Sequence, residues 1–315
     1  MMRSWLLAAL LVTGCIDAGD DGILVPATVA EDPSLPRFEL EDGRLVHLRT
    51  FGDPGLPVVI VLHGGPGGDH RDQLHLEALS DLRFVVLWDQ RGTGLSERVP
   101  DAELDGPTYL ADLDHIGRQL SPDRPFALIG HSWGGAYATY YAQHFPDRVD
   151  RLVLVEPGAL NPEAARRANV AAIDLGSGGL HETLNTTDYL LPDGDARADY
   201  FYVVALAGLR TDTPLLGYDF WRLGYRANVG INRWQGNFDR SYRFDATDGM
   251  DAFEPEVLFV TGLADGRLGD DLQRELHAPH FRRTRFVHLP DATHGELLRR
   301  PESIEAIRRY LAEAP

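Results

Sequence analysis

The stretch that most constrains this chain runs from Ala127 to Ala138 and reads ALIGHSWGGAYA. A short apolar run over Phe126–Ile129 predicts a buried strand. The strand stops at GHSWGG, residues 130–135, and good helix formers follow. Strand, sharp turn and helix, with Ser132 at the apex, is the pattern of a nucleophile elbow. We therefore expect the Ser132 hydroxyl to project from the edge of a sheet.

The residues around Ser132 have their own predicted tasks. A turn this tight has no room for side chains at Gly130 and Gly134, and we expect strained backbone at Ser132. Trp133 opens the following helix, so its N–H has no partner within that helix and points where a negative oxygen would form. Trp133 is therefore a predicted donor of an oxyanion hole.

Other parts of the chain predict the sheet that carries this turn. An antiparallel hairpin is expected over 37–40 and 44–49, and apolar runs predict buried strands over 57–62, 84–88, 149–155, 257–261 and 285–289. Helices are expected over 71–79, 108–120 and 301–311. The alternation of strands and helices breaks down over 156–254, which predicts an inserted, mainly helical cap.

The predicted fold class is thus α/β, with a mostly parallel central sheet. The core is expected over 37–156 and 255–315, and the cap over 157–254. Parallel strands with crossover helices place functional loops at the carboxyl ends of the strands. Ser132 follows one such end, and the loops HGGPGG (63–68) and DQRG (89–92) follow two others.

The formal net charge of −18 argues against nucleic-acid binding, which needs a basic face. The single cysteine, Cys15, excludes an internal disulfide and a thiolate metal cluster. It follows a positive start and a short apolar segment, residues 5–12, which together fit an export signal. A simple cleavable signal or a misassigned start is the alternative explanation.

The residues Val12-Thr13-Gly14-Cys15 resemble the lipidation box of bacterial lipoproteins. The resemblance implies a signal peptide over 1–15, acylation of Cys15, and export to a membrane in which this lipid anchors the chain. The location would be periplasm-facing or on the outer membrane, and Ile16 after the cysteine favours the outer one. Residues 16–36, rich in Asp, Gly and Pro, are predicted to be a flexible tether.

A serine hydroxyl is a poor nucleophile at neutral pH and needs a base. His294 is the favoured base, because it follows a predicted strand near the C-terminus among small residues. The rival histidines by type are His63, His131, His144 and His288. Asp265, on the loop after the strand at 257–261, is predicted to orient His294, with Asp270 and Asp271 as rivals.

The order Ser132, Asp265, His294 is that of a hydrolase triad. The second oxyanion donor is predicted to be the Gly65 N–H, with Gly64 as the alternative. No Walker-type phosphate loop is present in the sequence.

HGGPGG (63–68), WDQRGTGLS (88–96) and GHSWGG (130–135) together resemble the proline iminopeptidases of the α/β-hydrolase fold. The resemblance implies hydrolysis of a residue, often proline, from the amino terminus of a small peptide, with no metal or cofactor. It also implies that Asp89 and Arg91 are structural pairing residues.

The chain departs from this family in its cap. Family aminopeptidases bind the substrate amine with cap glutamates, whereas the comparable place here carries Gln235. Glu156 and Asp239 are possible substitutes, although either could be an ordinary loop carboxylate. Three classes stay open: a serine aminopeptidase, an esterase, lactonase or amidase on the same scaffold, and a non-catalytic binding protein. Ser132 argues against epoxide hydrolases and dehalogenases, which use Asp as nucleophile. The sequence does not fix the oligomeric state.

Overall fold

The computed structural model describes residues 25–168, 193–209, 220–262 and 267–313. These residues form an 8-stranded sheet in the order β1-β2-β4-β3-β5-β6-β7-β8. The first two strands pair antiparallel, as does β2 with β4, and all other pairs are parallel. The strands are β1 (Arg37–Glu39), β2 (Leu45–Phe51), β3 (Val58–Leu62), β4 (Phe84–Trp88), β5 (Phe126–His131), β6 (Val149–Val155), β7 (Val257–Gly262) and β8 (Thr284–Leu289).

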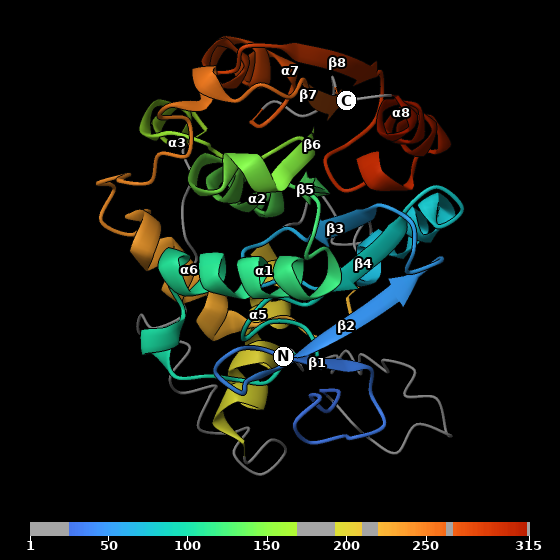
Figure 1. The fold of residues 1–315 in the computed structure, drawn as a ribbon. Helices are drawn as coiled ribbons and strands as arrows, with labels where there is room; N and C mark the ends of the chain where they lie inside the picture. The colour runs from blue at the N-terminus through green and yellow to red at the C-terminus, as the bar shows by residue number, and fades with distance from the viewer. Residues whose placement is uncertain (1–24, 169–192, 210–219, 263–266, 314–315) are drawn as a thin grey trace, which may run out of the picture.

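Helices cover both faces of the sheet, as Figure 1 shows. The α-helices are α1 (Gly106–Leu120), α2 (Trp133–His144), α3 (Pro162–Arg167), α5 (Gly194–Leu209), α6 (Tyr225–Gln235), α7 (Asp270–Leu272) and α8 (Pro301–Ala312). The segment predicted as the first helix is a 3-10 helix, η1 (Arg71–Leu79). The predicted mostly parallel α/β architecture is confirmed.

The central strand β3 shows why its sequence is a continuous apolar run. Val58, Ile60 and Leu62 face the layer that contains α1 and α2, whereas Val59 and Val61 face the layer that contains η1 and α8. Successive side chains of a strand point to opposite faces, so a strand covered on both sides has no polar face. Every residue of β3 is buried.

Between β6 and β7 the described chain contributes no strand to the sheet, and carries α3, α5 and α6. Helices α5 and α6 pack against each other, and Trp234 of α6 lies against Gly106 at the start of α1. The sheet then resumes at Val257. The insertion therefore leaves and re-enters the core at two adjacent strands, β6 and β7.

The prediction of a flexible tether over 16–36 is wrong for part of that range. Val29 is fully buried, and its N–H donates to the Leu95 carbonyl at 2.7 Å. The Arg222 guanidinium donates to the Pro26 carbonyl at 2.8 Å. An apolar side chain and these two bonds fix the segment against core and cap.

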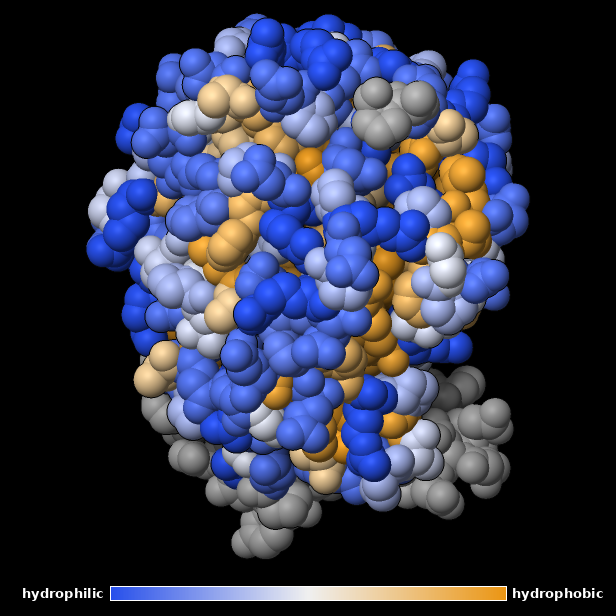
Figure 2. Space-filling model, in the orientation of Figure 1, coloured by the Kyte–Doolittle hydropathy of each residue, from blue (hydrophilic) through white to orange (hydrophobic). Residues whose placement is uncertain are grey.

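None of the described helices is both long and apolar enough to cross a bilayer. The face of the molecule seen in Figure 2 is mostly hydrophilic, with apolar side chains showing in narrow breaks.

Candidate active site

Ser132 lies between β5 and α2, at φ 55° and ψ −124°. This positive φ is strained for a residue with a side chain, and surrounding bonds must hold it. Its N–H donates to the Val155 carbonyl at 3.1 Å, and its carbonyl accepts from the Gly158 N–H at 2.7 Å. A Cβ at Gly134 would lie 2.0 Å from the Leu62 oxygen. The predicted tight turn is therefore present, and backbone hydrogen bonds to residues at and just after the end of β6 hold it in place.

His294 lies beside the residue that precedes Ser132. The Nε2 atom of His131 is 3.0 Å from the His294 carbonyl, and the two imidazole rings are 4.7 Å apart between centroids. A carbonyl only accepts, so His131 donates from Nε2. Burial, with nearby His294, lowers the pKa of His131 to about 3. His131 is therefore a neutral ring that packs against His294.

The carboxylate that contacts His294 in the described structure is Glu156, at the carboxyl end of β6. Its Oε2 atom lies 2.8 Å from His294 Nδ1, and its Oε1 atom accepts from the Gly262 N–H at 2.6 Å. The Glu156 side chain is fully buried. The carboxylate accepts from Nδ1, so neutral His294 keeps Nε2 as its proton acceptor.

The alternative that Glu156 is an ordinary surface or loop carboxylate is thus wrong, because its side chain is fully buried. The buried carboxylate is committed to His294 and to the end of β7. One signal in the sequence could have found it: a carboxylate directly after a buried strand, the same placement that drew attention to Asp265. Asp265 and Cys15 both lie outside the described residues.

The rival histidines have other partners. His63 accepts from the Gln90 N–H through Nε2 at 3.1 Å, and burial lowers its pKa to about 4. His144 is bonded to the Tyr140 carbonyl near the exposed end of α2. His288 on strand β8 pairs with Asp270 at 2.8 Å. His294 is the histidine that the structure places next to the serine turn.

The loop after β3 approaches the nucleophile closely. A Cβ built on Gly64 would lie 3.0 Å from the Ser132 Cβ. At Gly65 the φ angle is +129°, and a Cβ there would meet the Gly67 nitrogen at 2.5 Å. Trp133 is the first residue of α2, as predicted. Gly65 and Trp133 therefore stay the predicted oxyanion donors, with Gly64 as the alternative.

Gln235 and the other possible substitute, Asp239, both have partners within the cap. Gln235 is buried, and its side-chain oxygen accepts from Asn237 at 3.1 Å. Asp239 is 60% exposed and pairs with Arg243. Gln235 thus has no charge, and the Asp239 carboxylate lies on the surface beside a guanidinium.

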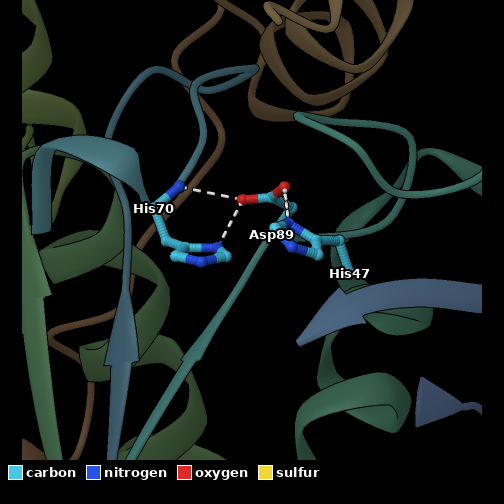
Figure 3. Close-up of side chains that lie close together, drawn as sticks. All are labelled: His47, His70 and Asp89. Atoms are coloured by element: carbon cyan, nitrogen blue, oxygen red, sulfur yellow. Dashed lines mark hydrogen bonds and ion pairs between the residues drawn. The ribbon is translucent and has the colours of Figure 1, made fainter. Parts of the chain in front are cut away.

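A second histidine–carboxylate cluster joins strand β2 to the loops that follow β3 and β4. Figure 3 shows His47 and His70 converging on Asp89, and we call these three residues the histidine hub. Each oxygen of Asp89 accepts one imidazole Nδ1–H and one backbone N–H: His70 supplies both bonds to Oδ1, and His47 and Leu95 supply those to Oδ2, at 2.7–2.9 Å.

The hub has the residue types of a metal site, but the Asp89 carboxylate has no free lone pair to offer a metal ion. All four acceptor positions of the carboxylate are engaged by protons, and a cation would have to displace them. Burial alone would raise the pKa of Asp89, but the His70 and His47 imidazoles hold it well below its ordinary value. We interpret the hub as a structural hydrogen-bonded centre.

Arg91 of the same loop is likewise a pairing residue. It forms a bidentate ion pair with buried Asp112, with distances of 2.6 and 2.8 Å, and contacts Asp42 at 2.8 Å. Burial alone would lower the pKa of Arg91, but these hydrogen bonds raise it above its ordinary value. The predicted structural role of Asp89 and Arg91 agrees with these contacts.

Comparison with known proteins identifies the fold that carries this site. Residues 57–185 match the family described as alpha/beta hydrolase fold. A solved thermophilic esterase from Thermogutta terrifontis is similar over 87% of this chain and 97% of its own, with a TM-score of 0.61 and 23% identity. This chain has the α/β-hydrolase fold.

Among curated relatives, this α/β-hydrolase chain is 35% identical over 118 residues to a proline iminopeptidase from Xylella fastidiosa. It is 34% identical over 121 residues to a soluble epoxide hydrolase from Corynebacterium. These matches cover 36% and 38% of the chain, and the chain spans only 37% and 41% of those relatives' lengths. The resemblance to proline iminopeptidases predicted from the three motifs is confirmed.

Proposed function

We propose that this protein is a serine hydrolase that acts through an acyl-enzyme. The observation that carries the proposal is one sheet edge, which we call the catalytic edge: Ser132 on a strained turn, His294 beside it and Glu156 bonded to His294 Nδ1. A hydroxyl, an imidazole with a fixed tautomer and a buried carboxylate are the groups that acyl transfer needs.

In the proposed reaction, His294 Nε2 takes the proton of the Ser132 hydroxyl as its oxygen attacks the substrate carbonyl carbon. The N–H groups of Trp133 and Gly65 hold the resulting oxyanion. The His294 imidazolium then gives its proton to the leaving amine or alcohol, and the acyl-enzyme remains. Water, activated by the same imidazole, attacks the acyl carbon and restores Ser132.

The substrate class rests on two observations that point in different directions. The similarity to proline iminopeptidases supports an aminopeptidase that releases N-terminal proline or another small residue from peptides. Gln235 supports the second candidate, an esterase, lactonase or amidase, because an amide lacks the charge that an ammonium group needs. We favour the aminopeptidase and keep the second candidate for direct comparison.

One experiment separates these candidates. Purified protein is assayed side by side with proline anilide and p-nitrophenyl esters, and is also treated with a fluorophosphonate that phosphonylates active serines. Faster anilide cleavage supports the aminopeptidase, and ester-only turnover supports the alternative. Absence of both turnover and Ser132 labelling would leave only the non-catalytic binding protein.

We also propose that the protein is exported and anchored through lipid on Cys15. The support is the VTGC sequence after a short apolar segment. In a bacterial host, fatty-acid labelling and membrane fractionation should find the wild-type protein lipidated and in membranes. The Cys15→Ser variant should carry no label. An unlabelled wild-type protein would contradict this anchor.

A further inference from the structure

Two carboxylates now compete for one role. The sequence pattern assigns Asp265 to orient His294, whereas the described structure puts Glu156 in contact with its Nδ1 atom. We propose that Glu156 is the positioning residue that fixes the His294 tautomer and stabilises its imidazolium. This inference rests on the proposed serine hydrolase function and names the carboxylate on which the imidazole depends.

The first argument is burial. The side chain of Glu156 is 0% exposed, and that of His294 is 18% exposed. An ionised carboxylate without water needs hydrogen-bond donors of its own. The Gly262 N–H on one oxygen and the His294 Nδ1–H on the other supply them. When His294 takes a proton from Ser132, the new positive charge forms beside a carboxylate that water does not screen.

The second argument is the way the backbone holds this carboxylate. Glu156 has a φ of 35°, an unfavourable angle for a residue with a side chain. Its N–H donates to the Val260 carbonyl at 2.9 Å, which ties it to β7. Strain of this kind persists only where the surroundings over-determine it, and it gathers at functional sites.

The third argument is that one short segment contacts both partners of the reaction. Val155 accepts from the Ser132 N–H, Gly158 donates to the Ser132 carbonyl, and Glu156 between them bonds to His294. The segment 155–158 therefore sets the serine and the imidazole relative to each other. A carboxylate elsewhere could bond to the imidazole, but this one is fixed to the same backbone as the nucleophile.

The test compares Glu156→Gln with Asp265→Asn as a matched, charge-removing control. Gln keeps the size of the side chain and an oxygen for the Gly262 N–H. We expect kcat to fall on the order of 10³-fold in Glu156→Gln with KM little changed, because the charge acts after substrate binds. The acid limb of the kcat/KM profile should move to lower pH, because the imidazolium loses a stabilising charge. Glu156→Asp should recover part of the loss.

A merely structural Glu156 would lower stability without moving the acid limb, and this outcome would overturn the inference. So would a Glu156→Gln variant with near wild-type kcat, or a limb that moves in Asp265→Asn alone. A smaller loss in Asp265→Asn than in Glu156→Gln supports it. If Glu156→Gln does not fold, the profile of Glu156→Ala, which also removes the charge, decides: an unmoved acid limb with near wild-type kcat refutes the role. An inactive, unlabelled wild type would instead refute the serine hydrolase function itself.

Discussion

The catalytic edge and the histidine hub both pair imidazole Nδ1 atoms with a buried carboxylate, yet they are built for different tasks. Asp89 accepts four hydrogen bonds, two on each oxygen, and its histidines are at most 3% exposed in their side chains. Trp221 packs edge-on against both hub rings, 5.0 and 5.3 Å away between centroids. His294, in contrast, is partly exposed and lies beside the nucleophile turn.

The difference teaches that a histidine–carboxylate pair is not by itself a catalytic signature. The surroundings of the other ring nitrogen, Nε2, decide whether the imidazole can exchange a proton with a substrate. The Nε2 atom of His70 is buried and has no hydrogen-bond partner among the described residues, so a proton taken there would have no route to a substrate. The four predictions below test this contrast, from the largest expected effect to the smallest.

The largest effect is expected at the nucleophile. Ser132→Ala should lower kcat/KM by about 10⁴-fold or more, because no other group at the catalytic edge can form the acyl-enzyme. Thermal unfolding should change little, since the backbone bonds that hold the turn involve no side chain. Turnover near the wild-type rate would remove Ser132 from its proposed role.

The second effect concerns the hub. Asp89→Asn should destabilise the fold by about 3–5 kcal/mol, because it removes the buried negative charge and leaves imidazole donors unmatched. Urea unfolding followed by tryptophan fluorescence measures this loss. The kcat per folded molecule, counted by fluorophosphonate labelling, should stay within about threefold of the wild type. A stable but inactive variant would break the contrast and give the hub a catalytic role.

The third effect is acid sensitivity. Burial lowers the pKa of His63 to about 4, and of His131 and His277 to about 3, whereas unfolded histidine titrates near 6.5. Below about pH 6.5 the unfolded chain therefore binds more protons than the folded chain. The free energy of unfolding consequently decreases as the pH is lowered. Each residue contributes at most about 1.4 kcal/mol per pH unit until its folded pKa is reached.

His277 offers the control for this prediction. Its Nε2 accepts from the Leu160 N–H at 3.1 Å and its Nδ1 bonds to Gln273, so protonation breaks an internal bond. His277→Gln should be less stable at neutral pH but should lose stability less steeply between about pH 6.5 and 4. Urea unfolding across this range checks it, and an unchanged slope would mean that His277 is not protonated on unfolding.

The smallest effect is expected at His131. His131→Phe keeps a ring against His294 but removes the donor to its carbonyl, so kcat should fall about tenfold, in line with one lost hydrogen bond. His144→Phe, a comparable change at a histidine that contacts no proposed catalytic residue, should match the wild type. Equal rates in both variants would show that His131 does not help to hold His294.

The outcome at each residue shows how much the sequence could predict. The turn at Ser132 is local, since a strand, glycines and a helix in succession specify it. The central strands could be predicted because each is a short, continuous apolar run. Strand β6 has the predicted bounds, and α8 ends one residue later than predicted. Glu156 was missed because its role depends on the end of β6 meeting the loop of His294 across more than a hundred residues. Local composition also misled at Val29, where one apolar side chain among polar neighbours decides the packing.

The packed segment near the start of the chain bears on where the proposed hydrolase would act. From Val29 the chain is fastened to the core, and Arg222 holds it as early as Pro26. If Cys15 carries lipid, the eleven peptide steps from there to Pro26 span at most about 40 Å when fully extended. The folded domain would then stay within that distance of the bilayer, and substrates of the proposed hydrolase would have to reach the membrane surface.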